Sequence, residues 1–358
     1  MVSPAEFTIE VLPIPQSLDG PDAADFLATV DVRNAAEVHG YGTTDVVYSA
    51  AEILPRWKDA HEPKVLWGAR SGGRIVARAL LEWGVDSLEA SWATIQVHPD
   101  HVGAGIGGAL HAAVETLARE RGFGRMLTYA VSPDRPGERL VPPTGAGSVP
   151  AGNREVRFLL DRGWRLEQVT RASRIALPID DAELVARRAS AAAAGDASYR
   201  VVTWAGATPE RWLEDQAMLF TRMSTEEPTA GLEAPEDPWD AQRVADYDAL
   251  NLESPSTVLT AAAAHAGTGH LVAFTQLSVP HDLTRPVSQE DTLVLREHRG
   301  HRLGMLLKTE NLIALQRDFR GHPSVLTWNA EENRAMLDVN EAVGFVPIGY
   351  EGAWRKDL

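Results

Sequence analysis

The sequence contains no cysteine in 358 residues. Disulfide bonds, thiolate zinc sites and cysteine nucleophiles are therefore excluded. It also lacks any apolar run near the roughly 18 residues that a membrane span requires. The N-terminus has no basic start followed by an apolar stretch, so it does not resemble a secretory signal. These absences predict a cytoplasmic protein with no membrane partner.

Basic residues are few compared with acidic ones, with 34 Lys and Arg against 50 Asp and Glu and a net charge of −16. A nucleic-acid partner is not expected, because phosphate binding needs a basic surface. Much of the negative charge lies between Ser224 and Glu253, where Arg243 is the only base. This stretch is either a solvated acidic loop or a lip that attracts a cationic substrate. Its carboxylates are Glu226, Glu227, Glu233, Glu236, Asp237, Asp240, Asp246, Asp248 and Glu253.

Length and composition indicate two domains, since a domain usually has about 150 residues and 44% of this chain is hydrophobic. We expect an N-terminal domain at 1–178, a linker at 179–198 and a C-terminal domain at 199–358. The linker contains an alanine-rich stretch, Ala189–Ala194, which could form a short helix.

An internal repeat supports this division. Val97–Gly107 resembles Val294–Gly304, and each stretch follows an apolar, β-rich run and opens an amphipathic helix. Further on, Gly163-Trp164 resembles Gly344-Phe345. The first copy is longer between these landmarks, and its surplus lies in Ser132–Gly152, which is rich in proline and glycine and is expected to be a loop.

In both halves an antiparallel start is followed by alternating strands and helices, a pattern that predicts a mixed α/β sheet. In the first half the expected strands are Phe7–Leu12, Lys64–Ala69, Arg74–Trp83, Leu88–Val97 and Met126–Val131, and the main helices are Ala23–Glu37 and Gly105–Arg121. In the second half the expected strands are Tyr199–Trp204, Thr257–Ala264, His270–Ser278, Thr292–Leu295, Val325–Trp328 and one near Val346–Glu351, with helices Pro209–Met223 and Leu303–Arg317.

Both repeated loops lie between a strand and a helix N-terminus, where unpaired backbone N–H groups and the helix dipole favour a phosphate. The glycines of the first loop also allow a ligand to approach the backbone. That loop fits the G-x-G-x-x-G fingerprint of nicotinamide-binding oxidoreductases as well, but the next strand, Met126–Val131, ends without the acidic residue that the fingerprint needs. A purely structural tight turn remains a further alternative.

The two loops resemble the Q/R-x-x-G-x-G/A signature of the GNAT superfamily of acyl-CoA N-acyltransferases, once in each half. The layout is similar to that of tandem, two-domain proteins of the mycothiol synthase type. The resemblance implies two tandem GNAT-like domains and an acetyl-CoA-dependent N-acetyltransferase. Its acceptor would be an amine that attacks the thioester directly, and the acidic stretch between Ser224 and Glu253 favours a small, cationic molecule. A non-catalytic tandem GNAT-like protein that binds CoA or another ligand is the alternative.

The resemblance also implies the residues that contact acetyl-CoA. Val102 and Arg302 depart from the signature, which has Arg or Gln and Gly at these positions. The family's later motif, N-x-x-A-x-x-x-Y-x-x-x-G-F, is matched from Asn333 to Phe345. The implied contacts are Val97, Val102, Gly103, Ala104, Gly105, Ile106, Gly107 and Gly108 in the first half, and Val294, Arg299, Gly300, His301, Arg302, Leu303, Gly304, Asn329 and Asn333 in the second.

The catalytic groups are less clear. Leu159 and Asn340 occupy the positions of the family's general-acid tyrosine, so the sequence identifies no acid and does not say which half is active. Strand residues two apart share a face, which places Glu89 with Val97. A carboxylate there could deprotonate an ammonium group. The alternative is an exposed carboxylate at the end of a strand.

By the same spacing, Glu290 shares the face of Val294 and is the candidate base of the second half. Two H-x-x-H pairs, His98 with His101 and His298 with His301, lie across strand-to-helix loops rather than on one helix. No metal is therefore expected.

Overall fold

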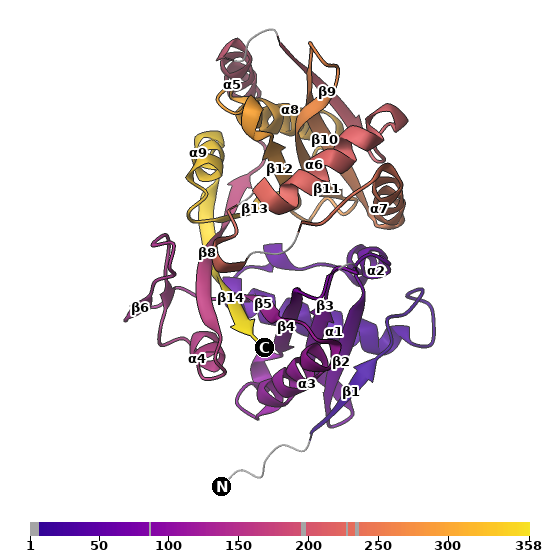
Figure 1. Cartoon of the computed structure of the whole chain (residues 1–358), viewed down its shortest axis with the longest axis vertical. Coiled ribbons are helices and arrows are strands. Elements are labelled where there is room, and N and C mark those ends of the chain that lie inside the picture. The colour runs from indigo at the N-terminus through magenta and orange to yellow at the C-terminus, as the bar shows by residue number, and fades with distance from the viewer. Residues whose placement is uncertain (1–6, 86, 195–197, 227, 233–235) are drawn as a thin grey trace. The chain divides into compact units, whose positions relative to one another are not determined.

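The computed structural model describes residues 7–85, 87–194, 198–226, 228–232 and 236–358. The chain forms two compact units (Figure 1). Unit 1 consists of Met1–Thr170, Thr229–Pro235 and Gly349–Leu358, and unit 2 of Arg171–Pro228 and Glu236–Ile348. The boundaries 1–178, 179–198 and 199–358 stay a prediction about independently folding domains.

Unit 1 is built on a sheet with the strand order β1-β2-β3-β4-β5-β14. The first four strands are antiparallel neighbours, β4 and β5 are parallel, and β14 is antiparallel to β5. The strands are β1 (Phe7–Leu12), β2 (Lys64–Ser71), β3 (Arg74–Glu82), β4 (Ala90–Val97), β5 (Arg125–Val131), the short pair β6 (Arg139–Leu140) and β7 (Val149–Pro150), β8 (Arg165–Ala176) and β14 (Val346–Asp357). The helices are α1 (Ala23–Tyr41), α2 (Ala50–Trp57), α3 (Ile106–Arg121) and α4 (Arg154–Leu160).

Both faces of this sheet are covered by helices. Ile106, Leu110 and Val114 of α3 recur at helical spacing and pack in one buried cluster with Trp67 of β2. The neighbouring strand residue, Leu66, belongs to a second cluster with residues of α1 and α2. Because consecutive strand residues point to opposite faces, α3 lies on one face of the sheet and α1 and α2 lie on the other.

Unit 2 repeats the arrangement, with the strand order β13-β12-β11-β10-β9 and parallel pairing between β12 and β13. The strands are β9 (Tyr199–Ala205), β10 (Ser256–His265), β11 (Leu271–Pro280), β12 (Val287–Val294) and β13 (Ser324–Ala330). The helices are α5 (Asp181–Ala194), α6 (Leu213–Glu226), α7 (Ala241–Glu253), α8 (Leu303–Asp318) and α9 (Arg334–Val343).

The expected mixed α/β architecture in two tandem parts is confirmed. The last strand is a correction. The pattern near Val346–Glu351 was expected to complete the second half, but β14 continues to Asp357, and Glu351–Asp357 pair with β5 in unit 1. A hydrophobic pattern identifies a strand but does not say which sheet it joins.

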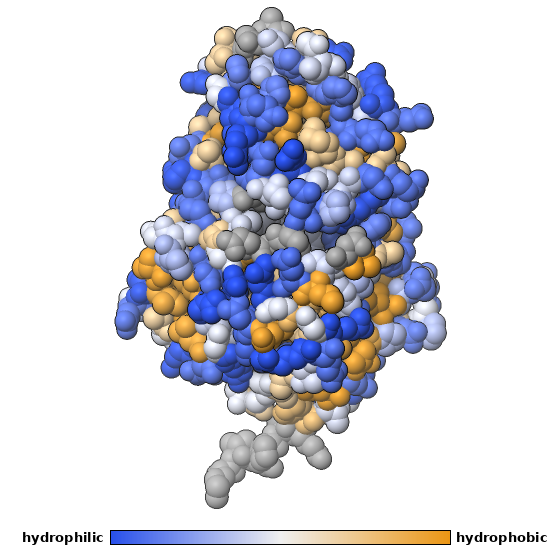
Figure 2. Space-filling view, viewed as in Figure 1, coloured by the Kyte–Doolittle hydropathy of each residue, from blue (hydrophilic) through white to orange (hydrophobic). Residues whose placement is uncertain are grey.

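No helix within the described ranges is both long and apolar enough to cross a bilayer. The face shown in Figure 2 is mainly hydrophilic, with smaller hydrophobic groups between the polar residues.

We expect unit 1 to depend on β14. The indole of Trp354 is 1% exposed and packs in the α3-side cluster, so Trp354→Ala should destabilise unit 1 by about 3–5 kcal/mol. Hydrogen exchange of the β5 amides should accelerate, because β14 is the strand that pairs with them. Val346→Ala, at an exposed position of the same strand, is the matched control. Unchanged exchange in Trp354→Ala would contradict this role of β14.

Candidate functional site

The parallel strands of unit 1 separate after a short paired segment. Their ladder runs from Ala90 opposite Arg125 to Trp92 opposite Leu127. Beyond that point, in the part of the chain that the structure describes, β4 continues to Val97 and β5 to Val131 without pairing to each other. The backbone groups that face this gap are available to a ligand.

The first glycine loop follows the open end of β4. Gly103 and Gly105 have φ of 92° and 85°, a conformation that L side chains rarely adopt. Gly105 is also the N-cap residue of α3. The loop therefore presents the first N–H groups of α3 beside the gap, which is the geometry of an anion site at a helix N-terminus.

Two arginines of the α4 region lie over this loop, and the sequence analysis missed both. A Cβ at Gly108 would stand 3.0 Å from Nη2 of Arg162, and one at Gly103 would stand 3.6 Å from Nη2 of Arg154. Arg162 is held in place by a hydrogen bond of 3.1 Å to the Phe158 carbonyl and by stacking over the Phe158 ring. Arg154 and Arg162 thus bring positive charge close to a loop that has Val102 where the signature has Arg or Gln.

A polar cluster lies on the opposite, α1-covered face. Gln96 of β4 donates from Nε2 to Oε1 of Glu37 on α1, at 2.6 Å. Its Oε1 accepts a 2.7 Å hydrogen bond from Nε of Arg78 on β3. Arg78 is 5% exposed, and its Nη1 has no hydrogen-bond partner among the described residues. Burial lowers the pKa of Arg78 to about 9.

The last strand brings a second carboxyl group to this cluster. Glu351 lies opposite Val131, the final residue of β5, and accepts a short hydrogen bond from the Tyr41 hydroxyl of α1. Gly349 permits this approach, since a Cβ there would stand 2.6 Å from the Tyr41 ring. Desolvation raises the pKa of Glu351 to about 7, opposed by the Tyr41 hydrogen bond.

Unit 2 has a similar opening. The β12–β13 ladder pairs Val287 with Val325 and Ser288 with Leu326, whereas β12 continues to Val294. In its loop Gly300 has φ of 90°, and Arg302 has φ of 54° and precedes α8. Arg302 therefore adopts the left-handed conformation that Gly105 has in unit 1, and the loop keeps its shape at some cost in strain.

Arg299, the signature arginine of this second loop, is engaged within unit 2. Its Nε donates to the Val294 carbonyl at 3.0 Å, and its Nη2 pairs with Glu226 of α6 at 2.9 Å. A cavity of about 410 Å³ lies beside this pair, between the end of α6 and the residues that follow β12. Arg222 and Arg296 are among its lining residues.

The asparagines expected to bind the cofactor have local partners. Asn333 caps α9 by accepting from the Met336 N–H at 3.3 Å. Asn329 accepts a 2.6 Å hydrogen bond from Nδ2 of Asn340. Asn340 is 2% exposed, and Leu159 is also buried, so neither position of the family's tyrosine holds a group that could protonate a thiolate. The contacts of Asn329 and Asn333 with a cofactor stay predictions.

The two carboxylates expected as bases lie apart from the open strand ends. Glu89 stands just before β4, at the paired end, where it is exposed and 3.5 Å from Arg125. Eight residues of strand, about 26 Å at 3.3 Å per residue, separate it from Val97.

For Glu290 the expected alternation does not hold. The register of β12 shifts between the pairs Leu277–Gln289 and Thr275–Thr292. A bulge of this kind reverses the faces of the residues beyond it. Thr292 accordingly shares hydrogen bonds with Gln289 and Thr275, so Val294 lies on the Gln289 face rather than on that of Glu290.

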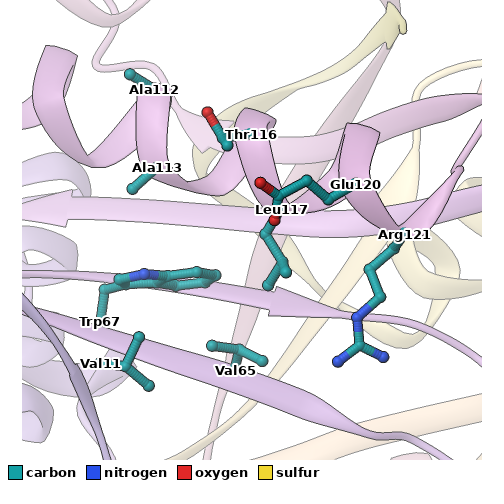
Figure 3. A pocket seen from close by; sticks show the side chains of 9 residues that line it. All are labelled: Val11, Val65, Trp67, Ala112, Ala113, Thr116, Leu117, Glu120 and Arg121. Carbon is teal, nitrogen blue, oxygen red and sulfur yellow. The ribbon is translucent and has the colours of Figure 1, made fainter.

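Two further features lie outside these sites. A pocket of about 550 Å³ in unit 1 is formed by Val11, Val65 and Trp67 with the outer face of α3 (Figure 3). It is near the β1 edge and includes none of the loop residues.

Within the described ranges, no three His, Asp or Glu side chains are grouped as a metal site. Nδ1 of His298 lies 3.0 Å from the Tyr199 hydroxyl.

Known proteins share this architecture. Residues 28–140 match the model of the acetyltransferase (GNAT) family. A tandem GNAT protein from the clavulanic acid biosynthesis pathway is 22% identical, with a TM-score of 0.72 and 98% of each chain covered.

The chain therefore has the tandem GNAT fold.

A GCN5-related N-acetyltransferase from Sphaerobacter thermophilus is 15% identical, with a TM-score of 0.64, 98% of this chain covered and 95% of the other. No curated protein sequence gives a significant match. Within the tandem GNAT fold, the β4–β5 opening, the loop at 98–105 and the start of α3 all lie inside the matched range 28–140.

Sequence reasoning missed Tyr41, Glu37 and Glu351 as site residues. Glu37 and Tyr41 are four apart, which places them on one face of α1, but no local pattern pairs that face with β4 or β14. Of the two arginines, Arg154 could have been found from the sequence, since it begins the helix that follows the proline- and glycine-rich loop; Arg162 lies just after that helix.

We expect the α4 arginines to hold phosphate groups in unit 1. Arg154→Ala combined with Arg162→Ala should weaken binding of coenzyme A by about tenfold, since hydrogen bonds to charged groups contribute roughly 1–3 kcal/mol and these are partly exposed. The loss should shrink in high salt. Arg157→Ala, exposed on the same helix, is the control. Titration calorimetry that gives equal affinities for both variants would remove the α4 arginines from the site.

Proposed function

We propose that this tandem GNAT protein is an acetyl-CoA-dependent N-acetyltransferase acting on an amine of a small, cationic molecule. Acyl transfer is the chemistry of the family whose model matches residues 28–140. The observation that carries the proposal is the combination, in unit 1, of separated parallel strands with an anion-binding loop at the end of β4.

The geometry of unit 1 supports this reaction. The loop and the α4 arginines lie on the α3 face and suit the phosphates of acetyl-CoA. The polar cluster with Glu37 and Glu351 lies on the α1 face. A thioester placed in the gap between the strands would meet an amine from the α1 face, where direct attack needs only proximity and a base.

A non-catalytic role in binding CoA is the second candidate. Leu159 and Asn340, at the positions of the family's general acid, favour it. A turnover assay with acetyl-CoA and a panel of amines separates the two functions. The protein contains no cysteine, so a thiol-reactive dye reports only released coenzyme A. Binding of acetyl-CoA without release of thiol for any amine would support the non-catalytic role.

The first loop can be tested directly. Gly105→Glu places a negative charge where the pyrophosphate is expected and should abolish measurable binding of acetyl-CoA to unit 1. Because Gly105 has φ of 85°, any side chain there is strained. Gly105→Ala carries the strain without the charge and should lose far less affinity. Equal affinities for wild type and Gly105→Glu would show that the loop does not bind the cofactor.

Unit 2 is proposed to bind acetyl-CoA as well. A Cβ at Gly304 would meet no atom within 4 Å, so Gly304→Glu adds charge without a clash. If both units bind, calorimetry should give two sites per wild-type chain and one in each glutamate variant. A wild-type stoichiometry of one that Gly304→Glu leaves unchanged would restrict binding to unit 1.

The acidic segment at 224–253 is expected to attract the cationic acceptor electrostatically. Several of its carboxylates have local partners: Asp237 pairs with Arg243 at 2.6 Å, and Glu226 pairs with Arg299. Glu227 and Glu233 lie outside the described residues. Neutralising the exposed Glu236, Asp246 and Glu253 together should raise KM for a polyamine by roughly threefold, because several like charges increase the local concentration of a cation.

The same net charge can be removed elsewhere as a control, by Asp31→Asn, Glu120→Gln and Glu138→Gln, all exposed. KM for acetyl-CoA should stay the same in both triple variants. Added salt should remove the difference in KM for the polyamine, since screening acts over about 8 Å at physiological ionic strength. If the KM for the polyamine is the same in wild type and in the acidic-segment variant, and does not change with added salt, the acceptor is a neutral or acidic amine.

A further inference from the structure

We propose that Glu351 of β14 is the general base of unit 1, held in place by Tyr41, and that Glu37 and Glu351 together receive the acceptor ammonium group. This proposal rests on the proposed acetyltransferase function. It assigns the proton transfer to a residue from the opposite end of the chain.

The position of Glu351 follows from the strand pairing. On the β5 side of the gap, Val131 ends the strand, and Glu351 is its partner on β14. Gln96 lies on the β4 side and close to that strand's end. Gln96 therefore borders the open end of the gap, and Glu351 lies one strand beyond it, beside Val131 at the end of β5.

One face of α1 spans the same opening. Glu37 and Tyr41 are four residues apart and so project from one side of the helix. Glu37 accepts from Gln96 on the β4 side, and Tyr41 donates to Glu351 on the β14 side. Gly40 of α1 sits directly on Val131, since a Cβ there would stand 2.8 Å from its side chain. The helix thus lies over the end of β5, brings the Glu37 carboxyl group to the opening and holds the Glu351 carboxyl group of β14 through Tyr41.

The two carboxyl groups at this opening have neutral hydrogen-bond partners among the described residues, Gln96 for Glu37 and Tyr41 for Glu351. The nearby arginines also donate to neutral oxygens, Arg78 to Gln96 at 2.7 Å and Arg33 to the Val46 carbonyl at 2.8 Å. Trp92 and Tyr129 stack at 5.3 Å on the same face of the sheet. An ammonium group could pair with the carboxyl groups while the carbon skeleton of the acceptor rests on the aromatic rings.

The reaction requires two protons to leave the acceptor nitrogen. The Glu351 carboxylate takes the first from the ammonium group, which frees the lone pair. The nitrogen then attacks the thioester carbonyl carbon, an N–C bond forms, and the C–S bond breaks with its electron pair going to sulfur. The second proton passes from nitrogen to the thiolate. The products are the amide, coenzyme A as the free thiol, and a protonated Glu351 that releases its proton to water.

The neighbours of Glu351 set the pH range in which it can act. The pKa of Glu351 is raised to about 7, mainly by desolvation; the Tyr41 hydrogen bond lowers it, the Glu37 charge raises it and the Arg33 charge lowers it, and the value is the net result. A base must be deprotonated to accept a proton. The value of kcat/KM should therefore rise with pH, with a midpoint near 7, and level off above it.

The test measures thiol release by the full chain across pH 5.5–9, together with acetyl-CoA binding by calorimetry. Glu351→Gln should lower kcat/KM by roughly a hundredfold and abolish the rise near pH 7, with acetyl-CoA affinity unchanged. Glu120→Gln, which removes an exposed carboxylate of α3, is the matched control and should keep both the rate and the pH profile. Glu89→Gln tests the rival candidate, and loss of the rise in this variant instead would assign the base to Glu89.

Two further variants separate a base from a structural residue. Tyr41→Phe removes the hydrogen bond that lowers the Glu351 pKa, so the midpoint should move to higher pH. Glu37→Gln removes the charge that raises it, so the midpoint should move to lower pH. These opposite shifts support the proposal even if Glu351→Gln does not fold.

Failures of the two proposals look different. A wild-type chain that binds acetyl-CoA but acetylates no amine overturns both the proposed function and the role of Glu351. A wild-type chain that turns over, with Glu351→Gln retaining its rate and pH dependence, overturns only the role of Glu351. Midpoints that do not move in Tyr41→Phe and Glu37→Gln have the same consequence.

Discussion

The separation of β4 from β5 beyond Trp92 and Leu127 is the constraint on which the unit 1 site depends. Two parallel strands that part leave backbone N–H and C=O groups without their usual partners, and such groups need a ligand or water. The strands remain ordered because each is held along its other edge. The β3 ladder extends to Val97 of β4, and the β14 ladder extends to Val131 of β5. The gap is therefore a fixed feature of a sheet that is paired on both sides of it.

The outer support of β5 comes from the far end of the chain. Without the residues from Glu351 to Asp357, β5 would have a partner only along its first three residues. β8 contributes to both units as well: it begins in unit 1, and its residues from Arg171 onward belong to unit 2. There Arg171 forms ion pairs with Glu331 and Glu341, at 2.6 and 2.7 Å. β8 and β14 thus each contribute residues to both units.

The sequence predicted the features that depend on local chemistry. The loops were located by their glycines, and the structure gives Gly103, Gly105 and Gly300 the left-handed conformations that glycine favours. Features that depend on long-range pairing were not predictable. The residue pattern of the last strand is the same whichever sheet the strand joins, so the sequence could not place Glu351 beside β5. Strand alternation also failed for Glu290, because a single shift of register in β12 exchanges the faces and leaves no mark in the residue pattern.

The charges near the two openings differ in a way that bears on their roles. In each unit, one helix contributes a carboxylate near the end of the separated strand, α1 in unit 1 and α6 in unit 2. In unit 2 this is Glu226, and Arg299 of the loop neutralises it at 2.9 Å, with Arg222 and Arg296 lining the cavity beside it. In unit 1 the loop has Val102 in place of that arginine, and the hydrogen-bond partner of Glu37 among the described residues is the neutral amide of Gln96. The proposed ammonium site therefore fits unit 1 better than unit 2, because Val102 cannot form the ion pair that Arg299 forms with Glu226.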